Sequence, residues 1–160
     1  MLLEHDRPAR TISKSKEAFI DSILVRFNLI DATTVATPLT PETHLSAVDC
    51  PTLKDKIEEM ANQPYKELVG ALVWLALRTR PGIAFATSSL ARFGHNLGRV
   101  YWDAAKRVLR YLNGTRQWRL VLGGKSAEIA AFTDADWGSH RDDRRSIGEY
   151  PISRRGQRHC

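Results

Sequence analysis

The sequence predicts an α+β fold, in which a mostly helical block is followed by the first hairpin of a sheet. Apolar residues recur with helical period over much of residues 15–112, whereas alternation of apolar and polar residues begins only near residue 118. The 160 residues are 42% hydrophobic and 26% charged, a composition typical of a globular domain with a full core. No apolar run reaches the roughly 18 residues of a membrane span and no signal peptide is evident, so we expect an intracellular chain without a membrane partner.

The first elements expected along the chain are a short hairpin and a helix. Residues 6–9 supply turn chemistry, and residues 10–12 form the returning strand. Ser15 is placed to cap a helix that runs to about Asn28. The buried face of this helix follows the i, i+3, i+4, i+7 pattern and comprises Ile20, Ile23, Leu24 and Phe27.

Three further helices and two strands are expected after a linker in which prolines break the periodicity. Pro64 begins a helix to about residue 77 that is apolar on most sides, which predicts burial all round. Pro81 begins a short helix to about residue 93, and a third helix covers residues 99–112 and ends at Asn113-Gly114. Residues 118–122 and 129–133 then form the two strands of a hairpin, with Gly123-Gly124 turning the chain between them.

The formal charge of +6 is unevenly spread along the chain, with a basic stretch from Arg99 to Arg119. Six cations between Arg99 and Arg119 face one anion, Asp103. The apolar stripe of the helix expected at residues 99–112 comprises Tyr101, Ala105, Val108 and Leu112. On the opposite face, Lys106, Arg107 and Arg110 form what we call the basic ridge. Such a ridge can follow a phosphate backbone and release counterions, and it is equally typical of the solvated face of an ordinary helix.

Other side chains with metal or redox chemistry give a weaker signal. The two cysteines, Cys50 and Cys160, are too far apart for a metal knuckle and are expected to be unpaired thiols, and the five histidines share no ligand spacing. Asp134 and Asp136 follow a predicted strand, where hard carboxylate oxygens suit Mg²⁺. The alternative for this pair is two polar residues that begin a loop.

Four strings in fixed order carry a family resemblance. They are Pro64-Tyr65-Lys66-Glu67-Leu68-Val69-Gly70, Thr79-Arg80-Pro81-Gly82-Ile83-Ala84-Phe85-Ala86, Ala105-Lys106-Arg107-Val108-Leu109-Arg110-Tyr111-Leu112-Asn113-Gly114-Thr115 and Phe132-Thr133-Asp134-Ala135-Asp136-Trp137. With these strings the chain resembles the copia-type retrotransposon Pol polyprotein, across the end of its reverse transcriptase and the start of its ribonuclease H domain.

The resemblance implies four parts of the chain. Residues 1–46 are the end of the reverse transcriptase palm and a thumb remnant, 47–63 a linker, 64–117 a helical connection, and 118–160 a truncated ribonuclease H-like start with an aberrant tail. In the family these reverse transcriptase parts grip the template–primer. The resemblance therefore implies weak binding of nucleic acid, as template–primer or RNA–DNA hybrid, with the basic ridge as the candidate contact.

The resemblance also implies an incomplete catalytic site. In the family the fourth string opens the ribonuclease H domain, and its first aspartate binds catalytic metal, a role that transfers to Asp134. Two Mg²⁺ ions need several carboxylates, and we expect the others, like the polymerase Tyr-x-Asp-Asp motif, outside these 160 residues. Asp142-Asp143 matches the family's Asp-Asp-Arg-x-Ser string, so it is expected to be a salt-bridged turn. Neither enzymatic activity nor firm Mg²⁺ binding is expected of the chain alone.

The sequence departs from the family after Ser146, where the family continues Ser-Thr-Ser-Gly-Tyr and an apolar strand. Codons exist for residues 152–160 that, read one base forward, encode Phe-Leu-Gly-Gly-Gly-Ser-Val-Thr, similar to the family at this place. We hypothesise a frameshift or misplaced exon end between about Ser146 and Ile152; the alternative is a basic tail selected for nucleic acid or targeting.

Three functions remain open on sequence. The first is a retroelement polyprotein fragment with non-specific nucleic-acid binding. The second is a non-enzymatic module co-opted by its host, with a protein partner at an open sheet edge. The third is a non-functional relic that folds poorly.

Overall fold

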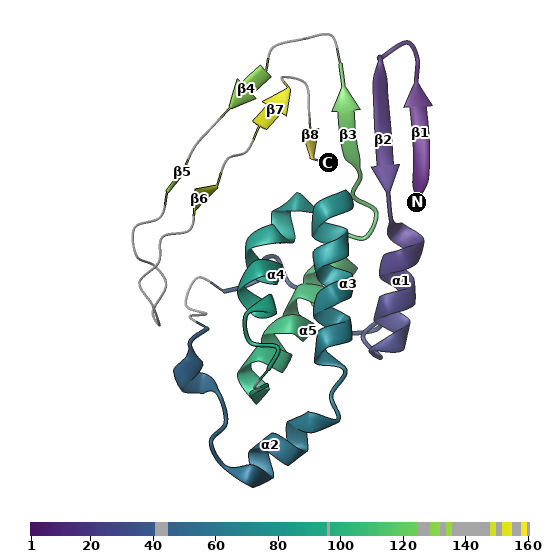
Figure 1. The fold of residues 1–160 in the computed structure, drawn as a ribbon. Helices are drawn as coiled ribbons and strands as arrows, with labels where there is room; N and C mark the ends of the chain where they lie inside the picture. The colour runs from purple at the N-terminus through teal and green to yellow at the C-terminus, as the bar shows by residue number, and fades with distance from the viewer. Residues whose placement is uncertain are drawn as a thin grey trace. The chain divides into compact units, whose positions relative to one another are not determined.

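A computed structural model of the chain describes residues 1–40, 45–95 and 97–124, together with the backbone of short strands between residues 129 and 159 (Figure 1). The chain divides into two units, of which one comprises Met1–Ser15 with Trp118–Cys160 and the other Lys16–Gln117. The first unit carries strands and the second carries helices. The α+β class expected from the sequence is confirmed.

The helical unit, Lys16–Gln117, contains the helices expected from the periodicity and two elements within the expected linker. Its α-helices and 3₁₀ helices (η) are α1 (Glu17–Arg26), η1 (Ala47–Asp49), α2 (Lys54–Ala61), α3 (Tyr65–Arg78), η2 (Pro81–Ile83), α4 (Ala84–Ala91) and α5 (Arg99–Gly114). Residues 47–63, expected as a linker, thus hold η1 and α2. The proline at position 51 interrupts the hydrophobic periodicity just before α2 begins, so the sequence pattern did not indicate this helix. No helix in the described part of the chain is long and apolar enough to cross a membrane.

The core of the helical unit is built from α1, α3, α4 and α5, which Figure 1 shows packed side by side. Three of the four residues expected on the inner face of α1, namely Ile20, Ile23 and Leu24, are buried, and Phe27 is half-buried against the same core. Ser15, expected as the cap of this helix, is instead the last residue of a strand, and Lys16 occupies the N-cap position. The helix starts one residue later than expected because the strand ladder extends through Ser15.

Helix α3 corrects the expectation that it is buried all round. One side of it is buried and comprises Tyr65, Leu68, Val69, Leu72, Leu75 and Ala76. On the other side Trp74 is 37% exposed and Leu77 is 79% exposed. Because the neighbouring helices of the unit cover only one side of α3, apolar residues remain on its outer side.

The strand unit contains a four-stranded antiparallel sheet in the order β1-β2-β3-β8. Its strands are β1 (Leu2–Asp6), β2 (Thr11–Ser15), β3 (Leu120–Gly123) and β8 (Arg158–His159). The N-terminal hairpin β1–β2 was expected from its turn residues and is confirmed, with Leu2 opposite Ser15. Two further antiparallel pairs join β4 (Ile129–Ala131) with β7 (Ile152–Arg154) and β5 (Asp134–Ala135) with β6 (Gly148–Glu149). The sequence after Ser146 therefore supplies three of the strands.

The pairing of β3 differs from the expected hairpin with the next strand along the chain. β3 pairs with β2, with Thr11 opposite Gly123. Gly123 has φ +105°, and a Cβ there would lie 2.3 Å from the carbonyl oxygen of Arg10. The N–H of Gly124 donates to this same carbonyl at 3.1 Å. The Gly123-Gly124 pair, expected to turn the chain, thus also lets β3 approach β2 closely.

Replacement by alanine is expected to have opposite effects on stability at two glycines of the helical unit. A Cβ at Gly98 would lie 2.6 Å from the carbonyl oxygen of Asp49, whereas a Cβ at Gly70, inside α3, meets no atom within 4 Å. We expect Gly98→Ala to destabilise the protein by about 2 kcal/mol through this backbone overlap. Gly70→Ala should stabilise it by about 0.5–1 kcal/mol through helix propensity. Urea unfolding followed by circular dichroism checks both, and equal effects of the two changes would contradict the close approach.

Candidate nucleic-acid interface

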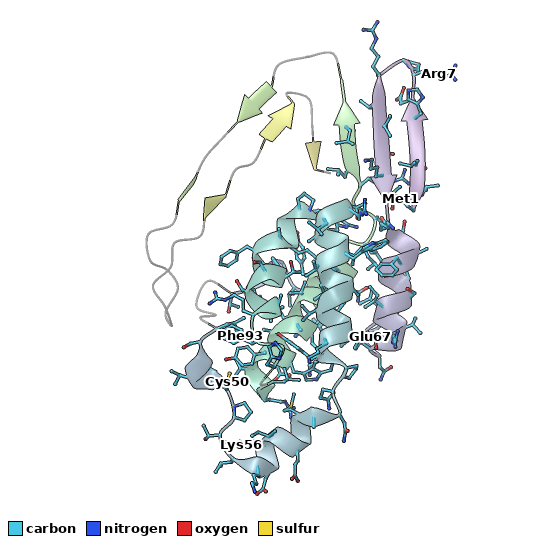
Figure 2. The ribbon with its side chains drawn as sticks, viewed as in Figure 1. Met1, Arg7, Cys50, Lys56, Glu67 and Phe93 are labelled. Carbon is cyan, nitrogen blue, oxygen red and sulfur yellow. The ribbon has the colours of Figure 1, made fainter. Side chains whose placement is uncertain are left out.

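The basic ridge lies on helix α5, whose other side is packed into the core. All four residues of its expected stripe, Tyr101, Ala105, Val108 and Leu112, are buried, which confirms the helical phase. The ring of Tyr101 stacks on Phe93 with centroids 4.4 Å apart, and its hydroxyl donates to the carbonyl of Ser46. Cys50, which Figure 2 shows on the same side as Phe93, places its Sγ 3.6 Å from that hydroxyl. The first turn of α5 is therefore held in place by the contacts that Tyr101 makes with Phe93, Ser46 and Cys50.

The three ridge residues lie half-exposed on the opposite side of α5. Each of them has a partner within the chain. Lys106 Nζ lies 2.8 Å from a carboxylate oxygen of Asp103. Arg107 Nη2 donates to Thr37 Oγ1 at 3.1 Å, and Arg110 Nε donates to the carbonyl oxygen of Thr33 at 2.6 Å. The structure thus brings the predicted ridge together on one face and also ties it to residues 33–37.

The other three cations between residues 99 and 119 are also paired. Arg99 approaches Glu59 at 3.2 Å and Asp103 at 3.4 Å. Arg116 lies 3.5 Å from Asp21, and Arg119 forms an ion pair with Glu4 within the strand unit. These pairs are exposed or half-exposed, so each contributes little to stability. They do partly neutralise a stretch that looks strongly basic in the sequence.

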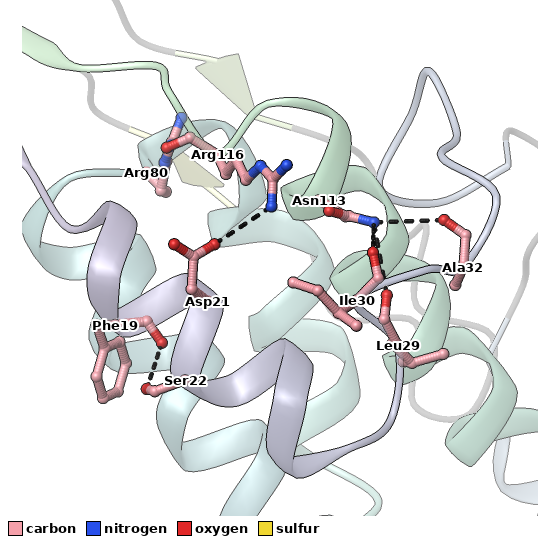
Figure 3. Close-up of polar contacts among 9 residues, drawn as sticks. All are labelled: Phe19, Asp21, Ser22, Leu29, Ile30, Ala32, Arg80, Asn113 and Arg116. Carbon is pink, nitrogen blue, oxygen red and sulfur yellow. Dashed lines mark hydrogen bonds and ion pairs between the residues drawn. The ribbon is translucent and has the colours of Figure 1, made fainter.

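Asn113 binds the segment that follows α1 through hydrogen bonds, a role that was not predicted from the sequence. Its Nδ2 lies 3.5, 3.0 and 3.3 Å from the carbonyl oxygens of Leu29, Ile30 and Ala32 (Figure 3). The next residue, Gly114, approaches Thr34 so closely that a Cβ would lie 3.1 Å from that side chain. The signal available in the sequence is the Asn-Gly pair, which predicts only a helix end. The pair in fact anchors the segment that contacts the ridge.

Arg80 is a second residue whose role the sequence did not reveal. Its side chain is buried, and Nη2 donates to the carbonyl oxygen of Arg116 at 2.7 Å. Burial lowers the pKa of the Arg80 guanidinium, and Tyr111 and Glu17 partly oppose this shift. Arg116 in turn pairs with Asp21 of α1, as Figure 3 shows. Arg80 therefore joins the ends of α3 and α5 rather than facing a ligand.

The predicted metal-binding aspartate is described only by its backbone. Asp134 lies in β5 opposite Glu149 of β6. Asp136 and the Asp142-Asp143 turn lie outside the described residues. Within the ranges that the structure describes, no group of three or more His, Cys, Asp or Glu side chains could hold a metal ion. The role of Asp134 in Mg²⁺ binding therefore stays a prediction, and no chemical step is derived from it.

Comparison with known proteins finds relatives over nearly the whole chain. It is 38% identical over 150 residues to the retrovirus-related Pol polyprotein from transposon TNT 1-94 of Nicotiana tabacum, covering 94% of this chain and 11% of that protein. It is 35% identical over 159 residues to the corresponding polyprotein from transposon RE1 of Arabidopsis thaliana, covering 94% and 10%. A match of 92 residues, 38% identical, joins 57% of this chain to 65% of the secreted RxLR effector protein 161 of Plasmopara viticola.

No family model matches the chain, and no solved structure matches it. The chain spans about a tenth of the length of the Pol polyproteins that it matches, at 33–38% identity. The similarity covers 94% of the chain and so includes both the helical and the strand unit. The homologues of this chain are therefore retrovirus-related Pol polyproteins of transposons.

Proposed function

We propose that this chain is a segment of a copia-type polyprotein, from the end of the reverse transcriptase to the start of the ribonuclease H domain, and that it binds RNA–DNA hybrid or template–primer without regard to sequence. The match to transposon Pol polyproteins supports the polyprotein origin. The four ordered strings support the finer position, with residues 64–117 as the connection and Asp134 as the first ribonuclease H aspartate. The basic ridge is the proposed contact.

One observation carries this proposal: two half-exposed arginines of the ridge, Arg107 and Arg110, are each held in place by a hydrogen bond to residues 33–37. A guanidinium has five N–H donors, and one hydrogen bond to the 33–37 segment is described for each of Arg107 and Arg110. A side chain already ordered loses less entropy when it binds, and the planar fork suits phosphate oxygens. Lys106 adds a third cation on the same face. The cations of the ridge are thus already ordered to contact successive phosphates of one strand.

A charge-matched pair of variants tests the ridge. We expect Lys106→Gln/Arg107→Gln/Arg110→Gln to weaken binding of an RNA–DNA hybrid, measured by fluorescence anisotropy across a salt series. The slope of log affinity against log salt should fall by about 0.9 for each phosphate that the ridge no longer neutralises. The control removes three exposed lysines away from α5, Lys54→Gln/Lys56→Gln/Lys66→Gln, and should leave the slope nearly unchanged.

Tight hybrid binding that ignores both salt and the ridge variant would contradict the proposal. Equal losses in the two triple variants would show a general effect of net charge and not a contact at α5. The same assay with Mg²⁺ present should leave the RNA strand uncut, because a two-metal site needs several carboxylates held together.

A second candidate function is a protein-interaction module. Strand β1 is exposed at all five positions, with Leu2 and Leu3 each 54% exposed, and an open strand edge can pair with another chain. A similar sequence makes up 65% of the Plasmopara viticola effector, so such a segment also occurs in a much shorter protein. A purified chain that unfolds cooperatively as a monomer would weaken this candidate. Failure to unfold cooperatively at all would favour the relic.

A further inference from the structure

Two cations and a tryptophan meet where α1 begins and α3 ends. The ammonium Nζ of Lys16 lies 3.2 Å from the ring centroid of Trp74. The ring of Phe19, one turn into α1, packs against Trp74 with centroids 4.6 Å apart and a tilt of 58°. Arg78 follows Trp74 by four residues, so the two side chains lie on the same side of α3. We call Lys16, Trp74, Leu77 and Arg78 the aromatic–basic corner.

Three of the four corner residues, those on α3, are open to solvent. Trp74 is 37% exposed and Leu77 is 79% exposed, and Arg78 is exposed beside them. Gly70, one turn before Trp74, leaves open space where a side chain would otherwise stand, with no atom within 4 Å. A helical side chain leans toward the preceding turn, so this gap lies beside the indole. The surface is therefore accessible and partly apolar.

The charge of the corner is not neutralised by the described residues. Lys16 is only 9% exposed, yet no hydrogen bond or ion pair joins it to a described side chain, and the indole ring of Trp74 is its nearest partner. Burial, and then the positive charge of Arg78, lower the pKa of the Lys16 ammonium, and no carboxylate counters them. Glu17, the next residue in the chain, acts on Arg80 instead. In this respect the corner differs from the ridge, where Asp103 offsets Lys106.

We propose that the aromatic–basic corner binds single-stranded nucleic acid, with a backbone phosphate between Lys16 and Arg78 and a base against Trp74 and Leu77. This inference rests on the proposed nucleic-acid function and adds a second contact, away from α5. Two like charges held close together gain most from a shared anion, because the anion relieves their repulsion. A single strand also presents flat base faces that fit against Leu77 and the part of the indole that Lys16 and Phe19 leave exposed. An acidic peptide would supply the anion but not the flat face of a base.

Four variants of the full chain test the corner by fluorescence anisotropy with a labelled oligothymidylate. Lys16→Gln/Arg78→Gln should weaken binding about tenfold and lower the salt slope by about 0.7 per phosphate contact. Trp74→Leu should weaken binding roughly tenfold with the slope unchanged, since stacking involves no counterions. The control Lys56→Gln/Lys66→Gln removes the same charge from exposed positions and should stay within about twofold of the wild type. Arg78→Gln alone changes only an exposed side chain, so it reports on binding even where the Lys16 or Trp74 change disturbs folding.

The probes separate this inference from the function on which it rests. Oligothymidylate binding that is unchanged in Arg78→Gln and in the double variant overturns the corner. If the ridge variant no longer binds either the hybrid or the single strand while the corner variants still bind both, the proposed nucleic-acid function is supported. The proposal of a second contact at the corner is then wrong. A wild-type chain that binds neither probe overturns both. Displacement of oligothymidylate by polyglutamate at equal charge concentration would overturn the corner as a nucleic-acid site and assign it to an acidic protein partner.

Discussion

Truncation of Leu72 to alanine is expected to destabilise the helical unit by about 3 kcal/mol. Leu72 is fully buried in α3, within the cluster that α1, α3, α4 and α5 share. Removing its branched end takes away apolar surface burial and leaves a cavity, because close-packed neighbours relax only partly. Urea unfolding followed by far-ultraviolet circular dichroism measures the loss directly, since most of the helical signal comes from this unit.

Leu77→Ala on the same helix is the matched control. Leu77 loses the same atoms, but its side chain is 79% exposed and its replacement leaves no cavity. Alanine is also the better helix former, so we expect a change within about 0.5 kcal/mol. A similar loss of stability in both variants would show that the outer side of α3 is covered in solution. That result would also remove the open surface on which the aromatic–basic corner depends.

Replacement of Asn113 by alanine is expected to lower the free energy of unfolding by about 2 kcal/mol, because carbonyl groups of half-buried residues lose their donor. The amide nitrogen has two hydrogens, which serve three carbonyl oxygens at 3.0–3.5 Å, those of Leu29, Ile30 and Ala32. These bonds join residues more than 80 positions apart. Their loss should also release residues 29–34 from α5, which hydrogen exchange of the amides in this segment would detect.

Two further substitutions sharpen this test. Asn113→Asp keeps the shape of the side chain but presents an acceptor to three carbonyl oxygens, so it should destabilise the protein at least as much as alanine. Asn62→Ala changes an exposed asparagine at the end of α2 and should have little effect. An Asn113→Asp protein as stable as the wild type would mean that the amide does not donate to this loop.

The candidate site shows how far sequence reasoning reached. The helical phase of α5 placed Lys106, Arg107 and Arg110 on one face, and the structure confirms that face because the opposite stripe is buried. The partners of Arg107 and Arg110 were not predictable, since Thr37 and Thr33 have no periodic relation to α5 that would indicate contact. The aromatic–basic corner was missed for the same reason: Lys16 and Trp74 are 58 positions apart and meet only through the packing of α1 on α3.

By itself the sequence determined the N-terminal hairpin, helices α1, α3, α4 and α5, and the likeness to transposon Pol polyproteins. Helical periodicity, turn residues and the four ordered strings act over short stretches, so they can be read without knowing the fold. The tertiary structure alone decided that β3 pairs with β2, that α3 is buried on one side, and that Arg107 and Arg110 bond to residues 33–37. Each of these depends on which distant segments come together. A pattern of period 2 or 3.6 states that a face will be buried, but not what will cover it.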